Sequence, residues 1–178
     1  MTYPAPDMIP AWVDGQLQPV EKLAVHQRGL RHKAVSVFVL HDDAVLLQRR
    51  ALGKYHTAGL WANTCCTHPY WNEAAAACAT RRLSQELGIH GLTLSPVGQV
   101  EYRATVGPGL IEHEVVDVFV ARVPQRPALA PDPAEVAEVC WMTLTDLTTD
   151  LGANPQAYVP WLHIYLTRHS AQIFADPT

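Results

Sequence analysis

One long helix set between groups of strands limits the folds that this chain can adopt. Residues Glu73 to Leu87 are rich in alanine and stop at Gly88, a residue that often ends helices, and Asn72 is a good cap for the helix start. Segments rich in β-branched or alternating apolar residues predict strands over 34–40, 44–50, 97–103, 110–123 and 135–142. Strands on both sides of a helix, followed by terminal helices, predict an α/β sandwich around a mixed β-sheet.

The N-terminal part of the chain is predicted to be an extended arm followed by a short hairpin. Three early prolines predict an extended, loosely held arm over residues 1–12, which leaves a single domain over 13–178. The pair Asp14-Gly15 then predicts the turn of a short hairpin between residues 12 and 25.

The C-terminal part is predicted to be helical. We expect a short helix over 144–151, with Thr143 or Thr145 near its cap. A final amphipathic helix is expected over 157–174, with Trp161 in a first turn that Pro160 begins.

Composition and charge exclude several classes of protein. At 178 residues the chain can bury a core without disulfides or structural metals. Its net charge of −4 and isoelectric point near 6.1 argue against a general nucleic-acid-binding protein, which needs a basic surface. Residues 1–12 lack the pattern of a signal peptide, and no apolar run is long enough to span a bilayer. Four cysteines without a CxxC pair do not suggest a disulfide framework, so we expect a cytoplasmic protein that binds neither nucleic acid nor membranes.

The segment from Trp61 to Pro69 carries the densest group of reactive residues. It holds two adjacent thiols followed closely by His68. In an extended chain Cys66 and His68 point to one face and Cys65 to the other. A thiol that takes part in chemistry usually has a charge partner or a metal nearby, so one thiol can face a site while its neighbour faces the core.

Two carboxylates alternate on the predicted strand 110–123. Glu112 and Glu114 lie on one face, about 7 Å apart along the strand. Two like charges on an otherwise apolar face are unfavourable unless a cation lies between them, so a metal-binding or proton-transfer role is favoured over a solvated edge strand. Upstream, His26 and His32 lie on either side of a glycine that lets the backbone turn and bring them together; either histidine alone is explained more simply as a surface or core residue.

Basic residues follow the predicted strand 44–50. Arg50 ends this strand and Lys54 lies in the loop after it, so both suit an anionic ligand, although a solvated loop explains them equally well. On the helix, Arg82 and Glu86 are four residues apart and share a face. As an exposed ion pair they would stabilise the helix by only about 0.3–0.5 kcal/mol, so a purely structural purpose would be modest.

The helix and the residues before it resemble the Nudix box, in which a glycine, an arginine and several glutamates recur at fixed spacing. The positions that match are Thr67 at the first glycine, Glu73 at the first glutamate, then Arg81, Leu83, Glu86 and Gly88-Ile89. Arg82 and Gln85 stand where hydrolases of this superfamily carry metal-binding glutamates. The metal cluster of a phosphohydrolase is therefore largely missing.

This degenerate box and its flanking motifs together resemble type 1 isopentenyl-diphosphate isomerase. The flanking motifs are Asn63-Thr64-Cys65-Cys66-x-His68-Pro69, Tyr102-Arg103-Ala104, Glu112-x-Glu114 and the segment Arg49-Arg50-Ala51-Leu52-x-Lys54. The resemblance runs from about Asp14 to Trp161 and implies a Nudix-like α/β/α sandwich. It also implies an isomerase of isoprenoid biosynthesis that interconverts isopentenyl diphosphate and dimethylallyl diphosphate through a tertiary carbocation. The chain departs from many members at Thr57-Ala58-Gly59 and at Asn72, which affects the expected loop shapes more than the chemistry.

The resemblance implies a role for each site residue. The catalytic residues would be Glu114 as proton donor, Tyr102 hydrogen-bonded to it, Cys66 as the opposing acid/base, and Trp161 as a π face for the cation. The diphosphate would bind Lys22, Arg50, Lys54 and Arg82. A divalent ion, Mn²⁺, Zn²⁺ or Mg²⁺, would bind His26, His32, His68, Glu112 and Glu114. A Mg²⁺ ion arriving with the substrate would bind Glu86 and the backbone carbonyl of Cys66.

The sequence is also compatible with two other functions. The first is a Nudix hydrolase of a nucleoside diphosphate derivative, which the residues at positions 82 and 85 disfavour. The second is a metal-stabilised interaction domain in which the histidines and thiols serve structure alone. As an isomerase, the chain is expected to bind a small-molecule substrate and to act as a monomer or weak homodimer.

Overall fold

The centre of the molecule is one nine-stranded sheet. The computed structural model describes residues 7–175. Strand β3 pairs with β1, β4, β6 and β8, and among the strand pairs only β3–β8 is parallel. The predicted mixed sheet is therefore confirmed. The strands are β1 (Met8–Val13), β2 (Gln16–Glu21), β3 (Arg31–His41), β4 (Ala44–Arg50), β5 (Trp61–Ala62), β6 (Cys65–Thr67), β7 (Ser95–Gly107), β8 (Leu110–Arg122) and β9 (Val136–Thr143).

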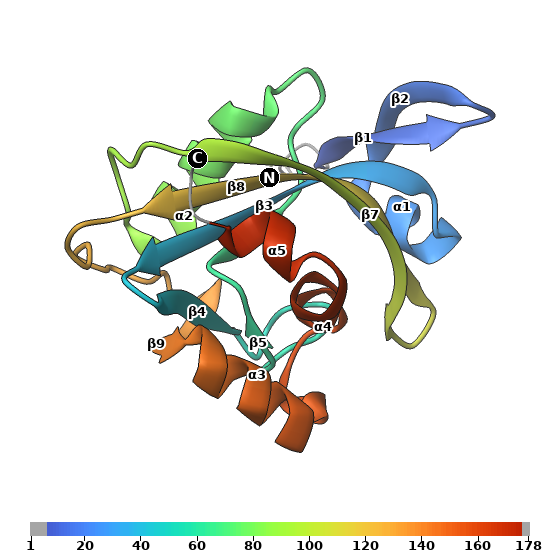
Figure 1. Cartoon of the computed structure of the whole chain (residues 1–178). Helices are drawn as coiled ribbons and strands as arrows, with labels where there is room; N and C mark the ends of the chain where they lie inside the picture. The colour runs from blue at the N-terminus through green and yellow to red at the C-terminus, as the bar shows by residue number, and fades with distance from the viewer. Residues whose placement is uncertain (1–6, 176–178) are drawn as a thin grey trace.

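Helices cover both faces of this sheet. They are α1 (Lys22–Arg28), α2 (Ala75–Leu87), α3 (Leu144–Ala153), α4 (Pro160–Arg168) and α5 (Ser170–Phe174), with a 3₁₀ turn, η1, at Pro155–Ala157. Figure 1 shows α2 on the opposite side of the sheet from α4 and α5. On one face Leu83 of α2 belongs to the core that includes Val35, and on the other face Tyr165 of α4 packs edge-on against Phe38. These two cores confirm the α/β/α sandwich.

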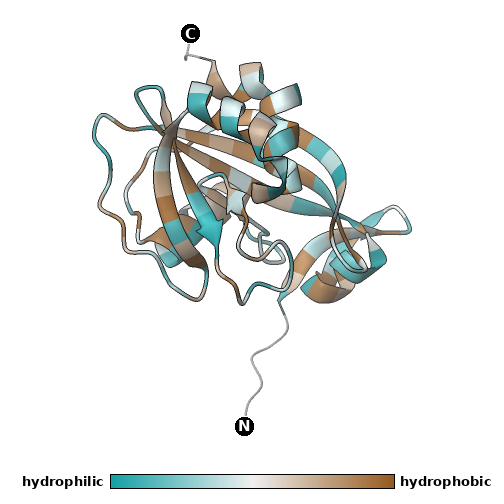
Figure 2. Ribbon diagram, turned by 90° about the horizontal axis from the view of Figure 1, so that it is seen from below, coloured by the Kyte–Doolittle hydropathy of each residue, from teal (hydrophilic) through white to brown (hydrophobic). Residues whose placement is uncertain are grey.

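Alternation along the central strands decides which side chains reach which face. In β3, Val35 and Val37 face α2, whereas Ser36 and Phe38 face the other way. In β6, Cys65 is fully buried in the core under α2 and its neighbour Cys66 lies on the opposite face, as the sequence predicted. Figure 2 shows hydrophobic residues along the central strands, and a mixture of hydrophobic and hydrophilic residues along the helices that cover them.

The N-terminal prediction needs correction. The predicted hairpin turn at Asp14-Gly15 is confirmed, but residues 8–12, expected in a loosely held arm, form β1 and pair with both β2 and β3. Ile9 and Ala11 of this strand are buried, because they pack with Val25 of α1. The remainder of the predicted arm, residues 1–6, lies outside the described residues.

Two helix boundaries also differ from the prediction. Asn72 does not cap α2; it adopts a left-handed conformation with φ of 67°, and the helix begins two residues later than expected. In place of the predicted C-terminal helix the chain forms η1, α4 and α5. The series of helical backbone hydrogen bonds is interrupted before Pro160, which has no N–H to donate, and again at His169. Two predicted caps are confirmed: Thr143 accepts from Asp146 N at the start of α3, and Gly88 ends α2 in the left-handed region.

None of the helices within residues 7–175 is long and apolar enough to cross a membrane.

Candidate active site

One cavity collects most of the predicted site residues. Cys66 and Glu114, which come from strands far apart in the sequence, both line it. Its other lining residues are Lys22, Arg50, Lys54, Tyr55, His56, Thr67, His68, Arg82, Tyr102, Glu112 and Trp161. The cavity wall therefore combines a thiol, two carboxylates, several cations and an indole.

Strand pairing brings the carboxylates and histidines together. His32 of β3 lies opposite Glu114 of β8 in the parallel pair, and Tyr102 of β7 lies opposite the same glutamate on the other side. Glu112 and Glu114 are both buried on one face of β8, as their alternation predicted. His26 reaches this face from α1, a helix that the sequence analysis did not predict and that Gly29 ends with a φ of 61°.

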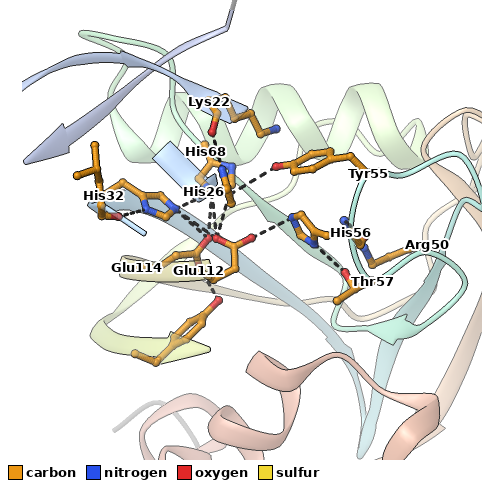
Figure 3. Close-up of polar contacts among 12 residues, drawn as sticks. Lys22, His26, His32, Arg50, Tyr55, His56, Thr57, His68, Glu112 and Glu114 are labelled. Atoms are coloured by element: carbon orange, nitrogen blue, oxygen red, sulfur yellow. Dashed lines mark hydrogen bonds and ion pairs between the residues drawn. The ribbon is translucent and has the colours of Figure 1, made fainter. Parts of the chain in front are cut away.

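Three histidines present ring nitrogens to one oxygen of Glu112 (Figure 3). The Nε2 atoms of His26, His32 and His68 lie 3.1, 3.3 and 3.8 Å from Glu112 Oε2. The Nδ1–H groups of His26 and His32 donate to the backbone carbonyls of Lys22 and Leu30. In the neutral rings the Nε2 atoms therefore carry lone pairs.

Lone pairs that face a carboxylate oxygen require a cation between them. Within the described part of the chain Glu112 Oε2 is buried without a hydrogen-bond partner. Histidines whose Nδ1–H groups are held by carbonyls are oriented as they are in metal sites. The set His26, His32, His68 and Glu112 can therefore hold a divalent metal ion, with Glu114 beside it.

Without a metal ion, the carboxylates of this cluster favour a proton on one of its histidines. Burial disfavours the charged form of His32, but its contacts with Glu112 and Glu114 outweigh this and raise its pKa to about 10. Burial likewise opposes ionisation of Glu112, but four histidine contacts hold its pKa well below the usual range. Burial lowers the pKa of His68 and of His56. A proton on His32 thus occupies the position that a metal ion would take.

Glu114 is held by hydrogen bonds at both of its oxygens. Tyr102 Oη donates to Oε2 over 2.6 Å, and His68 Nε2 lies 3.0 Å from Oε1. Burial raises the pKa of Tyr102 well above its ordinary value, so the phenol keeps its proton. The carboxyl group is therefore fixed in direction at the cavity wall.

Cys66 belongs to a small polar network with Ser36 and Asn63. The Cys66 thiol donates to Asn63 Oδ1 over 3.0 Å, and Ser36 Oγ lies 3.1 Å from Sγ. Asn63 Nδ2 donates to the carbonyls of Val37 and Cys65, which fixes its amide with Oδ1 towards the thiol. Burial raises the pKa of Cys66 to about 12, although the hydrogen bonds to Ser36 and Asn63 oppose this. The sulfur carries its proton at neutral pH.

Four cationic side chains, Lys22, Arg50, Lys54 and Arg82, also line the cavity. Lys54 and Arg82 share Glu135, with Arg82 Nη2 3.2 Å from its Oε2. Burial and the neighbouring cations lower the pKa of Lys22. Arg50 lies 5.4 Å from the centre of the Trp161 ring. This clustering favours an anionic ligand over the solvated loop that also explained Arg50 and Lys54 in the sequence.

Glu86 is the one predicted ligand whose carboxylate is already engaged away from the cavity. Its Oε1 accepts from Arg82 over 2.6 Å and its Oε2 accepts from Gln48 over 2.8 Å. The side chain is buried and does not line the cavity. The predicted shared face of Arg82 and Glu86 is confirmed as an ion pair, but a partly buried rather than an exposed one.

Several residues of the site were not predicted from the sequence. His56 and Tyr55 line the cavity, Glu135 bridges two of its cations, and Ser36 and Asn63 hold the thiol. For His56 the one available signal was an extra imidazole two residues after Lys54. The other residues carry no local pattern that separates them from core or loop positions.

Comparison with known proteins agrees with this geometry. A family model described as the NUDIX domain matches residues 30–162, and the chain belongs to this family. The structure resembles that of DR0079 from Deinococcus radiodurans, with a TM-score of 0.72, 13% identity and coverage of 90% of this chain and 97% of the other. It also resembles a MutT NUDIX hydrolase from Burkholderia pseudomallei, with a TM-score of 0.61, 21% identity and coverage of 78% and 98%. At these identities the two structures show the fold alone.

Curated relatives narrow the family further. A protein of Cereibacter sphaeroides named isopentenyl-diphosphate Delta-isomerase is 64% identical over 95% of this chain and 96% of its own length. Proteins of the same name from Dinoroseobacter shibae and Rhodobacter capsulatus are 60% and 59% identical, over 94% and 98% of this chain and 96% and 99% of their own lengths. Within the NUDIX family, the chain belongs to the isopentenyl-diphosphate Delta-isomerases.

Proposed function

We propose that this enzyme interconverts isopentenyl diphosphate and dimethylallyl diphosphate by adding a proton to one carbon and removing a proton from another. A proton added to the terminal methylene gives a tertiary carbocation. Loss of a proton from the methylene on the other side of the cationic carbon gives the allylic product. The observation that carries this proposal is that Cys66 and Glu114 line one cavity that four cationic side chains also line. Two proton-transfer groups and phosphate-binding cations are the parts that this reaction needs.

Glu114 is the proposed proton donor and Cys66 the proposed acceptor in the forward direction. The hydrogen bond from Tyr102 orients the Glu114 carboxyl group. The protonated thiol corresponds to the state after forward turnover, from which the reverse reaction begins. Because the reaction is reversible, both protonation states of the pair are needed.

The remaining cavity residues would bind the substrate. Trp161 would present its π face to the carbocation, a contact that contributes about 2 kcal/mol or more when desolvated. A base in that position would capture a proton, whereas an indole cannot. The diphosphate would bind the four cations Lys22, Arg50, Lys54 and Arg82.

Two divalent ions are part of the proposal. A Mn²⁺, Zn²⁺ or Mg²⁺ ion held by His26, His32, His68, Glu112 and Glu114 would make a protonated Glu114 a stronger acid. A Mg²⁺ ion that arrives with the diphosphate would bind Glu86 and the backbone carbonyl of Cys66. Since Arg82 now donates to Glu86, Arg82 would transfer its hydrogen bonds to the phosphate when the substrate binds.

The cytoplasm is the proposed setting, and a monomer or weak homodimer the proposed assembly. All four cysteines are free, and a reducing compartment keeps Cys66 as a thiol. The substrate is a small molecule, and neither nucleic acid nor a membrane is a proposed partner.

The test is turnover in D₂O with isopentenyl diphosphate and Mg²⁺, followed by NMR. We expect deuterium in the dimethylallyl product from the wild type, and none from Cys66→Ala or Glu114→Gln. Cys140→Ala is the matched control, because this thiol lies on β9 outside the cavity. Phosphate release without isomerisation would favour the hydrolase instead.

A further inference from the structure

His56 makes a contact that no predicted role explains. Its side chain is buried, and its Nε2 lies 3.0 Å from Glu112 Oε1. The other oxygen of the same carboxylate faces His26, His32 and His68. Figure 3 shows His56 on the side of Glu112 away from His32. The two oxygens of Glu112 therefore have different partners.

The contacts of His56 determine its tautomer. A carboxylate oxygen only accepts hydrogen bonds, so His56 Nε2 carries the hydrogen and donates to Oε1. In the neutral ring Nδ1 is then an acceptor, and Thr57 Oγ1 lies 2.9 Å from it as the donor. Each polar atom of the imidazole thus has one partner of the correct type.

The loop around His56 is built to hold this ring. Thr57 has a φ of 46°, a conformation that is strained for a β-branched residue. The ring packs edge-on against Tyr55 at 4.4 Å and against Trp161 at 6.1 Å between centroids. Arg50 Nη2 donates to the backbone carbonyl of His56 over 3.3 Å. The imidazole is therefore held from several sides.

We propose that His56 is a positioning residue for the metal centre, which holds Glu112 so that Oε2 alone turns towards the three histidines. A carboxylate without such a partner can rotate or bind an ion through both oxygens. A donor fixed on Oε1 leaves one oxygen for the ion and sets its direction. His56 itself lies outside the group of converging ligand atoms. This inference rests on the metal centre of the proposed function.

The test is binding of Co²⁺ alone, measured by calorimetry and by visible absorption, without substrate. We expect His56→Ala to weaken Co²⁺ binding about 10- to 100-fold, the usual effect of removing a residue that orients a ligand. The absorption bands should keep their positions, because every ligand remains. His56→Gln should restore most of the affinity, since its amide N–H can donate to Oε1. His90→Ala, at an exposed histidine, is the matched control and should bind as the wild type does.

Three results would overturn this role. One is equal Co²⁺ affinity in His56→Ala and wild type. The second is a band shift that indicates a lost nitrogen ligand, because His56 would then be a ligand itself. The third is a His56→Gln variant that binds no better than His56→Ala although both melt as the metal-free wild type does. Failure of the metal centre is distinguishable, since His32→Ala would then bind Co²⁺ as tightly as the wild type.

Discussion

Tyr102 and Glu114 lie directly opposite each other in the β7–β8 pair, and the phenol donates a hydrogen bond of 2.6 Å to the carboxyl group. Strand register, rather than a flexible loop, therefore sets the direction of the proposed proton donor. Both side chains are buried at the wall of the cavity that Cys66 also lines. Rigid elements hold proton-transfer groups more accurately than loops do.

Removal of this hydrogen bond should slow turnover. We expect Tyr102→Phe to lower kcat about 10- to 100-fold, because a hydrogen bond to a charged group contributes about 1.5–3 kcal/mol. KM should change little, since the proposed diphosphate-binding residues are the cations Lys22, Arg50, Lys54 and Arg82 and not Tyr102. Initial rates with isopentenyl diphosphate measure both constants. A variant with wild-type kcat would show that Tyr102 does not assist Glu114.

The network around the thiol leads to a second prediction. Asn63→Ala should lower kcat at least about 10-fold and destabilise the fold by about 1–3 kcal/mol, because it frees Cys66 and removes a side-chain donor from two buried carbonyls. Ser36→Ala removes the other partner of Sγ and spares those carbonyls, so it should lower kcat with a smaller change in melting temperature. Rates and thermal melts are compared with Asn154→Ala, an exposed control. Unchanged kcat in Asn63→Ala would contradict the role of this network.

The metal-free protein should lose stability as the pH rises. Its His32 pKa of about 10 exceeds the ordinary value of 6.5, so the folded state binds this proton more tightly than the unfolded chain. The stabilisation is complete below about pH 6.5 and disappears as the pH approaches 10. Thermal melts with a chelator should show this fall, and saturating Mn²⁺ should reduce it. His32→Gln, with a chelator, is the control, and a slope as steep as that of the wild type would assign the effect to another group.

Glu135 should compete with anionic ligands for Lys54 and Arg82, which line the cavity. Its pKa is lowered by Lys54 and Arg82, which outweigh the opposing effect of burial, so it is ionised at neutral pH. We expect Glu135→Gln to tighten binding of inorganic diphosphate about 3- to 10-fold. The substitution removes a negative charge whose interaction with the two cations contributes about 1 kcal/mol and which the diphosphate must otherwise displace. Calorimetric titration measures this, with Glu138→Gln as control, since Glu138 pairs with Arg49 on the exposed surface. Weaker binding by Glu135→Gln would mean that the carboxylate orders the cations instead.

The sequence by itself determined the type of most of the central elements and the reactive motifs, although it did not predict β1 or α1. Side-chain alternation in β8 placed Glu112 and Glu114 on one face, and alternation in β6 separated Cys65 from Cys66. Gly88 identified the end of α2. These features depend on local backbone geometry, which neighbouring residues decide. The same local motifs were sufficient to identify the family.

The tertiary structure alone decided which residues meet around those motifs. The pairing of His56 with Glu112, the bridge from Glu135 to Lys54 and Arg82, and the incorporation of residues 8–12 into the sheet join segments far apart in the chain. Local periodicity does not record such contacts, because they depend on strand register and on the packing of side chains from different elements. The site is therefore visible in the sequence as a set of residue types, and the directions of its hydrogen bonds only in the folded chain.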